Sequence, residues 1–308
     1  MARLGNTGLD VFPICFGANI FGWTADEAES RVVLDAYTSA GGNFIDTANS
    51  YLVEHGQSEQ IIGRWMAEHG NRGQLVVATK VGGGRRPELR NLRPETVESE
   101  CEASLERLQT DFIDLYYAHY DDTATPLEES LGAFDRLVKS GRVRHIGASN
   151  YTADRLAAAL KVQDELGLAR FTVLQPHYNL MEREFERTLL PVAEDWDLAV
   201  APYSGLASGF LTGKYRPGQE NPSSPRAERA RAYLDQGGVA VLEALDEVSG
   251  ARGTTIAAVA LAWLLAQPRV AAPIASARTP GQLSEVLPAA RLHLTPEEVA
   301  RLSDASPS

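Results

Sequence analysis

Short apolar segments alternate with amphipathic helical segments along almost the whole chain of 308 residues. Eight of the apolar segments have the length of buried strands, and they occur at residues 12–16, 44–45, 75–78, 112–118, 143–146, 172–174, 198–201 and 270–274. Parallel neighbours in a sheet need a long crossover between them, which is usually a helix. The alternation therefore predicts an α/β fold built on a parallel sheet.

The segments between the strands carry signals for helix starts. A threonine followed three residues later by Glu or Gln is typical of a capping box, and this pattern occurs at residues 24–27, 125–128, 279–282 and 295–298. Proline, which is favoured at the first helical position, follows the threonine at Pro126, Pro280 and Pro296, and Pro94 is expected to open another helix. Two further helices are expected, at about residues 227–249 and 255–266.

A closed barrel is the arrangement that we favour for this sheet. An open doubly wound sheet is the alternative, but its glycine-rich turn after the first strand is missing, and the glycines at 82–84 follow the third strand instead. We expect a (β/α)8 TIM barrel as a single domain over residues 1–308, with a β-hairpin at residues 2–11 closing its bottom. Extra helices are expected after strand 7 and at the C-terminus, and the irregular segment 205–226 is expected to be a lid or an insert.

The bulk composition limits the partners of the chain. A formal net charge of -12 at pH 7 would repel nucleic acid and anionic membrane surfaces, so neither is expected as a partner. The apolar segments are too short to span a membrane, and Cys15 and Cys101 are expected to be buried thiols in a reducing compartment. We therefore expect a cytoplasmic protein, whose oligomeric state the sequence does not indicate.

Polar residues follow nearly every predicted strand. They are Asn19, Asp46, Lys80, His119, Ser149, Asn150, Gln175, Tyr203, Ser276 and Arg278. A cap, a snorkelling lysine or a hydrogen-bonded core histidine would explain any one of them. Because the active site of such a barrel lies at the carboxyl ends of its strands, we expect the whole set to gather in one site.

Asp46, Tyr51, Lys80 and His119 give this site a specific chemistry. A lysine at the end of a buried strand needs a counter-charge, and Asp46 on the neighbouring strand is the nearest candidate. We expect the Lys80 ammonium to lower the pKa of Tyr51, which makes Tyr51 a general acid for a carbonyl oxygen, with His119 as a second hydrogen-bond partner. No residue of the site carries a hydride, so a cofactor must supply one.

No other chemistry is indicated. No serine or cysteine nucleophile has an evident base beside it, and no histidine–carboxylate spacing resembles a zinc site, so no metal is expected. The substrate, a small carbonyl compound, is expected to contact a loop at residues 82–91 and four apolar residues. These four are Ile20, Phe21, Trp23 and Tyr120.

Eight segments of the chain also form a set with a defined order and spacing. They are Leu4-Gly-Asn-Thr-Gly-Leu9, Phe44-Ile-Asp-Thr-Ala48 with Tyr51, Thr79-Lys80, His119-x-x-Asp122, Gly141-Arg-Val-Arg144, Ile146-Gly-Ala-Ser-Asn150, Gln175-Pro-His-Tyr-Asn-Leu180 and Ala207-Ser-Gly-Phe-Leu-Thr-Gly-Lys214. Nearly end to end, the chain thereby resembles the aldo-keto reductase superfamily. The resemblance implies carbonyl reduction by NAD(P)H bound across the barrel mouth, with Tyr51 as the acid, Lys80 and Asp46 tuning it, and His119 orienting the carbonyl.

The resemblance also implies a set of cofactor contacts. Ser149, Asn150 and Gln175 match positions that hydrogen-bond the nicotinamide amide, and Tyr203 matches the ring that stacks on it. The loop of Ser204, Gly205, Leu206 and the following residues to Lys214 would lie over the pyrophosphate. The positions implied for the adenosine and its 2′-phosphate are Ser276, Arg278, Gln282 and Glu285.

Three residues depart from the pattern of the family. Gly205 stands where many members have proline, Ser276 replaces a frequent glycine, and Val286 stands where many members use asparagine against adenine. These departures put the order of the loop and the adenine contact in doubt. NADPH is expected in preference to NADH, because Arg278 lies just before a helix start and its guanidinium matches phosphate geometry.

Three functional hypotheses remain open. The leading one is a reductase of aldehydes or ketones, which could also run in reverse on a sugar or an alcohol. The second is a nicotinamide-binding, redox-sensing regulatory subunit with little turnover. The third is a barrel hydrolase with paired carboxylates, but only Asp46 reaches the rim clearly.

Overall fold

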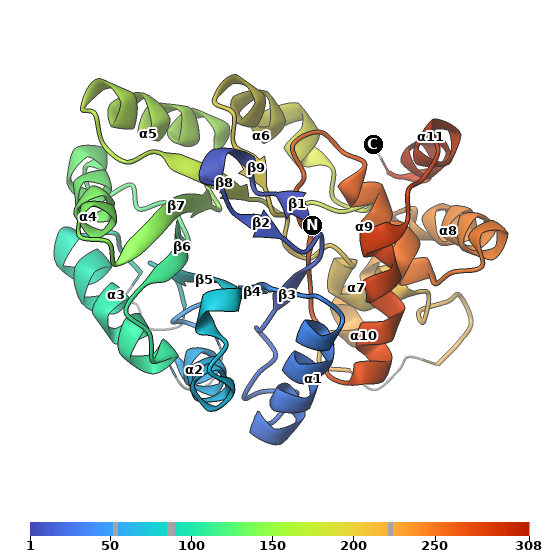
Figure 1. The fold of residues 1–308 in the computed structure, drawn as a ribbon. Helices are drawn as coiled ribbons and strands as arrows, with labels where there is room; N and C mark the ends of the chain where they lie inside the picture. Colours follow the sequence, from blue (N-terminus) through green and yellow to red (C-terminus); the bar gives the residue numbers. More distant parts are fainter. Residues whose placement is uncertain (52–54, 85–89, 221–223, 308) are drawn as a thin grey trace.

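The computed structural model describes residues 1–51, 55–84, 90–220 and 224–307. Its centre is a sheet of eight parallel strands, and each strand coincides or overlaps with a predicted apolar segment. The strands are β3 (Cys15–Gly17), β4 (Phe44–Asp46), β5 (Val76–Val81), β6 (Ile113–Ala118), β7 (Val143–Ser149), β8 (Phe171–Gln175), β9 (Ala199–Val200) and β10 (Ile274–Ala275). The predicted parallel sheet is confirmed (Figure 1).

The two edge strands of this sheet, β9 and the segment that leads into β10, are joined to each other. The Val200 N–H donates to the Arg269 carbonyl at 2.8 Å, and the Ala271 N–H donates to the Val200 carbonyl at 2.9 Å. Pro273 has no N–H to donate, which explains why β10 is shorter than the predicted strand at residues 270–274. These bonds close the ring that the sequence predicts.

A two-stranded antiparallel hairpin covers the amino-terminal end of the barrel (Figure 1). Its strands are β1 (Ala2–Arg3) and β2 (Asp10–Val11), joined through a 3-10 turn at Gly5–Thr7. Leu4 and Val11 are wholly buried and pack against inward-facing strand residues such as Leu115. The predicted hairpin at the bottom is confirmed.

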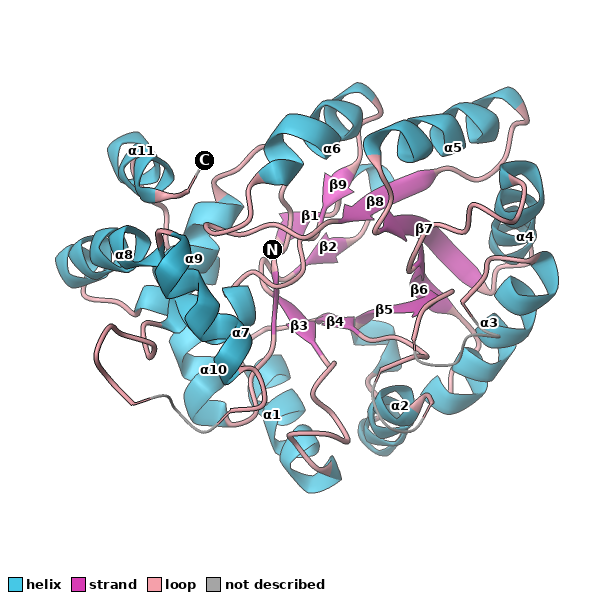
Figure 2. Ribbon diagram, turned by 180° about the vertical axis from the view of Figure 1, so that it is seen from behind, coloured by secondary structure: helices cyan, strands magenta, loops and turns pink. Residues whose placement is uncertain are grey.

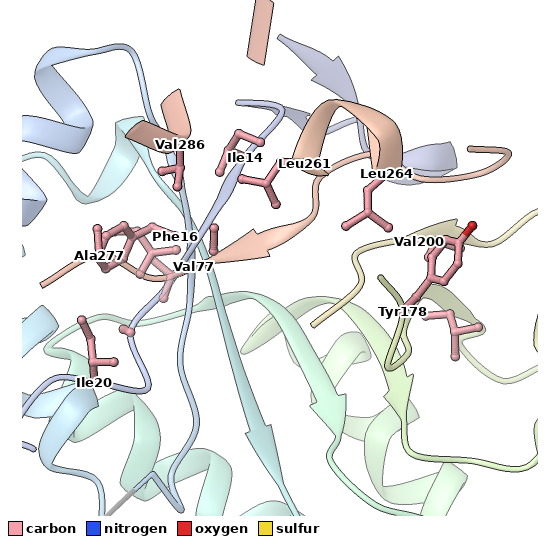
Figure 3. Packing of buried hydrophobic residues seen from close by; sticks show 14 of the residues in the cluster. Ile14, Phe16, Ile20, Val77, Tyr178, Val200, Leu261, Leu264, Ala277 and Val286 are labelled. Carbon is pink, nitrogen blue, oxygen red and sulfur yellow. The ribbon is translucent and has the colours of Figure 1, made fainter. Parts of the chain in front are cut away.

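The helices surround the barrel (Figure 2). They are α1 (Glu27–Ser39), α2 (Gln57–His69), α3 (Pro94–Leu108), α4 (Leu127–Lys139), α5 (Ala153–Glu165), α6 (Glu184–Asp195), α7 (Ala227–Ala232), α8 (Gly238–Arg252), α9 (Ile256–Leu265), α10 (Pro280–Val286) and α11 (Pro296–Ala305). Figure 3 shows the packing beneath α9, where Leu261 and Leu264 belong to the same buried cluster as Ile14 and Val286. In the described parts of the chain no single helix has the length and apolar composition of a membrane span, and only α8 and α9 together, bent by 97°, meet those criteria.

The helix starts were predicted with mixed success. Thr295 and Glu298 form the predicted capping box of α11, and Pro94 opens α3. Thr279 caps α10 through the Gln282 N–H, but the Gln282 side chain accepts from the Arg278 N–H instead of returning to Thr279.

Two of the predicted starts are wrong. Helix α1 is capped by Asp26 with Glu29, a second capping box two residues beyond Thr24. At α4 the N-cap is Pro126, and the hydroxyl of Thr125 donates to Asp122 at 2.6 Å. Asp26 therefore replaces Thr24 as the cap of α1, whereas at α4 the hydroxyl of Thr125 is taken up by Asp122.

The connections differ from the prediction in one further respect. The helix expected at residues 227–249 is divided into α7, a 3-10 turn and α8, because Gly237 adopts a left-handed φ of 85°. The irregular segment 205–226 contains a 3-10 helix at Ala207–Thr212, and its residues 221–223 lie outside the described residues. The same holds for residues 85–89 of the predicted pocket loop. Cys15 and Cys101 are free and buried, as predicted.

Candidate active site

A cavity of about 610 Å³ opens at the carboxyl ends of the barrel strands. It brings together residues predicted for different roles. All the residues implied as cofactor contacts line it: Ser149, Asn150, Gln175, Tyr203, Ser204, Gly205, Leu206, Lys214, Ser276, Arg278, Gln282 and Glu285. The predicted catalytic and substrate-pocket residues that line it are Asp46, Tyr51, His119, Ile20, Trp23 and Tyr120.

Lys80 and Phe21 are not among the lining residues. The side chain of Lys80 is wholly buried behind Tyr51 and Asp46. Phe21 is also wholly buried, with its ring centroid 5.5 Å from that of Phe16 in the core. The prediction that Phe21 forms a wall of the pocket is therefore wrong, because burying its ring in the core removes a large apolar area from water.

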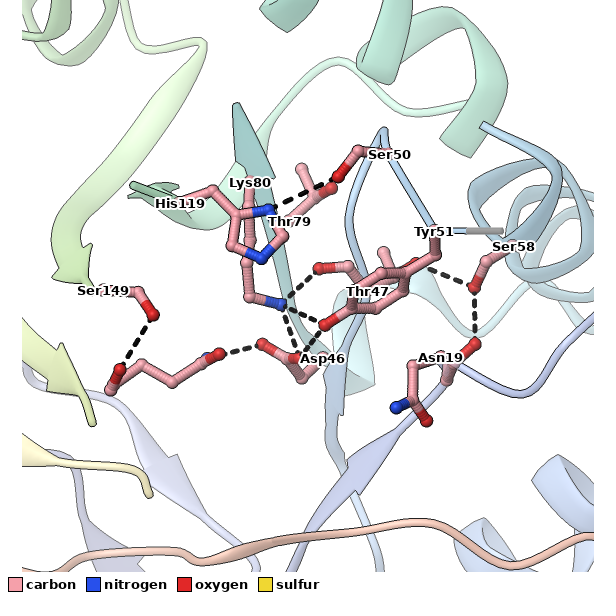
Figure 4. A network of polar contacts seen from close by, with 12 residues as sticks. Asn19, Asp46, Thr47, Ser50, Tyr51, Ser58, Thr79, Lys80, His119 and Ser149 are labelled. Carbon is pink, nitrogen blue, oxygen red and sulfur yellow. Dashed lines mark hydrogen bonds and ion pairs between the residues drawn. The ribbon is translucent and has the colours of Figure 1, made fainter. Parts of the chain in front are cut away.

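Asp46, Lys80 and Tyr51 form one connected polar group (Figure 4). Along β5 the alternate residues Val76, Ala78 and Lys80 face the barrel interior, which brings Lys80 next to the end of β4. The Lys80 ammonium donates to Asp46 Oδ1 at 2.6 Å, to the Tyr51 hydroxyl at 2.8 Å and to the Thr47 carbonyl at 2.7 Å. Each of the three ammonium protons of Lys80 has an acceptor. The buried ammonium is therefore held in one position, and its bond to the Tyr51 hydroxyl fixes the position of the phenol.

The buried position of this group changes its acidity. Burial lowers the pKa of Lys80, and the adjacent Asp46 carboxylate opposes that shift. Burial raises the pKa of Tyr51 well above its ordinary value, and the negative charge of Asp46 raises it further. The prediction of a lowered pKa for Tyr51 is wrong, because desolvation and Asp46 together outweigh the stabilisation that the Lys80 ammonium gives to the phenolate. Tyr51 is consequently a protonated phenol throughout the neutral range.

His119 directly follows β6 and lies beside Tyr51, with ring centroids 6.1 Å apart and the planes nearly perpendicular. Burial, with a smaller effect from Lys80, lowers the pKa of His119 to about 3. Its Nδ1 lies 3.4 Å from Ser50 Oγ. A side chain at Gly83 would collide with the imidazole, since a Cβ there would lie 2.5 Å from Nδ1. His119 is thus a neutral imidazole in a fitted space, able to donate one hydrogen bond.

A second chain of hydrogen bonds continues around the rim from His119. The Asn150 amide donates to the His119 carbonyl at 2.8 Å, and its oxygen accepts from the Tyr203 hydroxyl at 2.9 Å. The Gln175 amide donates to Asp46 Oδ2 at 2.8 Å, and its backbone carbonyl accepts from Ser149 Oγ. Residues implied as cofactor contacts are therefore bonded directly to Asp46 and His119, two of the predicted catalytic residues.

Three cations also line the cavity: Lys214, Arg226 and Arg278. The Arg226 guanidinium lies 5.5 Å from the centroid of the Trp23 ring, which lines the same cavity. No ion pair within the described residues involves any of them. Partial burial and the charge of Arg278 lower the pKa of Lys214. Burial, with smaller effects from Arg229 and Arg278, lowers that of Arg226. Like charges held together without carboxylate partners form a site for an anion, against the overall negative charge of the chain.

The backbone between these cations and Tyr203 is strained. Ser204, Ala207 and Ser208 have positive φ angles of 57°, 47° and 60°, in a loop that lines the cavity. Non-glycine residues adopt this region at a cost of order 1–3 kcal/mol each. Such strain persists only where the surroundings enforce it, and it often marks a ligand site.

The residues after β10 line the cavity and also make hydrogen bonds that hold the fold together. Ser276 Oγ donates to Asn19 Oδ1 at 2.9 Å across the seam between β10 and β3. The Gln282 side chain holds the Arg278 N–H at 2.9 Å, which fixes the backbone from which the guanidinium extends. Val286 is almost wholly buried in the main core and presents only an apolar surface to the cavity.

Sequence reasoning missed several residues of the site. Arg226 was absent from the prediction, although a cation that ends a long irregular segment next to a helix start is a usable signal. Glu59 was also missed: it is wholly buried and accepts from Thr79 Oγ1 at 2.5 Å and from Arg107 at 2.7 Å. The bond to Thr79 fixes the strand residue next to Lys80.

Known proteins that resemble this chain are oxidoreductases by name, and the family model that matches it is that of the aldo/keto reductases. The model of the Aldo/keto reductase family matches residues 13–307. An uncharacterized oxidoreductase of Bacillus subtilis, YrpG, is 38% identical over 316 residues, covering 99% of this chain and 95% of that protein. The norsolorinic acid reductase stcV of Emericella nidulans is 34% identical, covering 97% of this chain and 79% of that protein. The aldo-keto reductase ausK of Aspergillus calidoustus is 34% identical, covering 96% and 78% respectively.

Proposed function

This chain belongs to the aldo/keto reductase family, and from that premise we propose that it reduces an aldehyde or ketone with NADPH. The reverse reaction, oxidation of a sugar or an alcohol, would use the same groups. The observation that carries the proposal is the Tyr51 phenol, which lines the cavity and touches both the Lys80 ammonium and the Asp46 carboxylate. The names of the relatives, which include reductases, agree with it.

The residues of the cavity fit a nicotinamide dinucleotide phosphate. Lys214, Arg226 and Arg278 offer unpaired charge to its phosphates, and Arg278 is the residue that we expect to select NADPH over NADH. Asn150 and Gln175 offer amides to the nicotinamide end, and the flat ring of Tyr203 lines the same cavity. When bound, the cofactor supplies a hydride to the carbonyl carbon.

The residues of the chain handle the proton. The raised pKa of Tyr51 keeps the phenol protonated at neutral pH, so it can donate to the carbonyl oxygen as negative charge develops there. The phenolate that results lies 2.8 Å from the Lys80 ammonium, which stabilises it until a proton returns. Asp46, held by Gln175, opposes the effect of burial on the pKa of Lys80 and so favours the charged ammonium.

His119 and the exposed aromatic residues position the substrate in this proposal. The neutral imidazole donates one hydrogen bond to the carbonyl oxygen without competing with Tyr51 for the role of acid. Trp23 and Tyr120 line the cavity and are 42% and 49% exposed, so the substrate can lie against aromatic faces. Ile20 adds an apolar contact at the same side.

The test is steady-state turnover of 4-nitrobenzaldehyde, followed through NADPH absorbance, in the wild type and in Tyr51→Phe. Removal of the general acid should lower kcat by about 10²- to 10⁴-fold. The affinity for NADPH should change by less than about 2-fold, because the phenol acts in the transition state. Tyr120→Phe is the matched control, since Tyr120 lines the same cavity outside the bonded group, and it should keep kcat within a few-fold.

Two outcomes would contradict the proposal. NADPH binding without turnover of any carbonyl compound in a broad screen would favour the redox-sensing regulatory subunit. Turnover that survives Tyr51→Phe would remove Tyr51 from its role as acid and leave the site without one.

A further inference from the structure

His177 stacks on Tyr203, an aromatic residue that lines the cavity. The ring centroids are 5.1 Å apart and the planes differ by only 7°. This is the most nearly parallel pair of rings in the described part of the chain, where the other pairs are tilted or edge-on. Tyr203 lines the cavity and His177 does not. One face of Tyr203 is therefore covered by His177, which leaves the opposite face for a ligand.

The backbone holds this pair in register. His177 and Tyr203 form a parallel β-bridge beyond the ends of β8 and β9, and the Tyr203 N–H donates to the Pro176 carbonyl at 2.9 Å. The Tyr203 hydroxyl is bonded to Asn150, which is itself bonded to the backbone of His119. A displacement of the Tyr203 ring would therefore reach both the cofactor contacts and the catalytic group.

No hydrogen bond of the His177 Nε2 atom explains why a histidine occupies this position. Its Nε2 atom is buried and has no hydrogen-bond partner within the described residues. A protonated ring would carry a buried Nε2–H without an acceptor, whereas the neutral ring with its proton on Nδ1 carries none, so the neutral form is the one that fits. Burial lowers the pKa of His177, with Glu182 opposing and Arg229 reinforcing the shift. What the ring provides is a flat, neutral surface behind Tyr203.

We propose that His177 is a positioning residue that holds Tyr203 as an uncharged platform for the nicotinamide end of the cofactor. This inference rests on the proposed function. The oxidised nicotinamide ring carries a positive charge and the reduced ring does not, so a neutral support accepts both forms. A cation behind Tyr203 would repel the oxidised form selectively.

Three substitutions separate the stacking from the charge. His177→Phe keeps a flat ring and removes the orphan nitrogen, His177→Ala removes the ring, and His177→Arg keeps a planar group but adds a permanent charge. Exposed His293, changed to Ala, is the matched control away from the cavity. For each variant the dissociation constants of NADP+ and NADPH are measured by fluorescence titration, together with Tm, kcat and KM.

The expected results differ between the variants. His177→Phe should bind both cofactor forms within about 2-fold of the wild type with an equal or higher Tm, since removing an unpaired buried polar atom is neutral or stabilising. His177→Ala should weaken both forms by roughly 2- to 12-fold, the range that an aromatic pair contributes to an equilibrium constant. His177→Arg should weaken NADP+ by roughly 5-fold more than NADPH.

Each contrary outcome has a definite meaning. Wild-type affinities in His177→Ala, or equal losses in His177→Ala and His177→Phe together with a lower Tm, would overturn the platform and leave His177 as ordinary packing. Equal losses of NADP+ and NADPH in His177→Arg would overturn the role of charge. Failure of the wild type to bind either form would overturn the proposed function, and this inference with it, whereas the other outcomes affect the inference alone.

Discussion

The two sides of the cavity satisfy their charged groups in opposite ways. On the acid–base side, Lys80 is bonded to Asp46, Tyr51 and a backbone carbonyl, and Asp46 is bonded in turn to Gln175. On the anion side, Lys214, Arg226 and Arg278 form no ion pair with a carboxylate among the described residues, and burial together with the positive charges of Arg278 and Arg229 lowers the pKa values of Lys214 and Arg226. The charged groups of the acid–base side are all paired within the protein, whereas the cations of the anion side are left to pair with a negatively charged ligand.

This difference fits the role that we propose for each side. A general acid has to be in place when the transition state forms, and partners supplied by the protein keep its geometry fixed. A site for an anionic ligand gains affinity from cations that are not already neutralised. We therefore expect mutations on the acid–base side to reduce both the unfolding free energy and kcat. Mutations on the anion side should reduce only the affinity for the cofactor.

Lys80→Met is the change that should break the acid–base side most severely. It leaves the Asp46 carboxylate buried without its partner, which costs about 3–5 kcal/mol of unfolding free energy, and it removes the cation that stabilises the Tyr51 phenolate. We expect kcat to fall by about 10²-fold or more. Urea denaturation and steady-state kinetics measure the two effects.

Lys161→Met is the control for Lys80→Met. Lys161 pairs with Glu165 at 3.7 Å on an exposed helix surface, and such pairs contribute only about 0.5 kcal/mol. Equal destabilisation by the two substitutions would show that burial of the Asp46–Lys80 pair carries no special cost.

Arg278→Ala tests the anion side. Charge-assisted hydrogen bonds contribute about 1.5–3 kcal/mol each, so the loss of one or two should weaken NADPH binding by roughly 10- to 100-fold or more. NADH, which lacks the 2′-phosphate, should bind as before, and the unfolding free energy should be unchanged. Fluorescence titration with both cofactors measures the preference.

Arg216→Ala provides the matched control for Arg278→Ala. Arg216 is already neutralised by two bonds to Asp246 and does not line the cavity. It should leave both cofactor affinities intact. If Arg278→Ala weakened NADH as much as NADPH, Arg278 would hold the adenine or the fold instead, and the preference would need another cause.

The pH dependence of stability offers a smaller effect on the acid–base side. His119 stays neutral in the folded state down to a pKa of about 3, whereas an unfolded histidine takes up a proton near pH 6.5. The contribution of His119 is therefore fully present above pH 6.5 and is lost as the pH falls toward 3. Between pH 7 and pH 5 the slope rises toward about 1.4 kcal/mol per unit, so the loss over this range is about 2 kcal/mol.

Replacing His119 by Asn should flatten that slope. Urea denaturation at pH 7, 6 and 5 gives the unfolding free energy of both proteins. The same slope in wild type and His119→Asn would mean that His119 titrates normally in the folded protein and is not the neutral donor that the site requires.

The barrel and its rim could be predicted from sequence because they depend on local periodicity. A buried strand must be apolar, and a polar residue such as Asp46 or His119 directly after it has to lie at the mouth of a parallel barrel. The failures come from competition that a local pattern does not reveal. Asp26 displaced Thr24 as a helix cap, and burial reversed the expected shift in the pKa of Tyr51.

Contacts between distant segments were the least predictable part of the site. The bonds from Gln175 to Asp46 and from Thr79 to Glu59 join residues 129 and 20 positions apart. The stack of His177 on Tyr203 is of the same kind. The sequence places each residue at a strand or helix end, but the partner depends on how the barrel closes.

Gly205→Ala should give the smallest effect, and it tests whether the backbone of the loop on the anion side depends on a ligand. Gly205 lies between strained Ser204 and the 3-10 helix, and its own φ is not left-handed, so alanine can adopt its backbone conformation. A Cβ there would lie 3.1 Å from the terminal methyl groups of Leu261 and Leu264, which can move by the few tenths of an ångström required. Replacing glycine by alanine at such a position stabilises a fold by about 0.4–1 kcal/mol, by reducing the freedom of the unfolded chain. If the loop orders further when the cofactor binds, the same reduction in chain freedom tightens NADPH binding by roughly 2- to 5-fold while kcat stays constant.

Titration with NADPH and a thermal melt without cofactor separate the effect of Gly205→Ala on binding from its effect on stability. A higher Tm with unchanged affinity would mean that the loop is already ordered before binding, and that only the charges of the anion side, not its backbone, depend on the ligand.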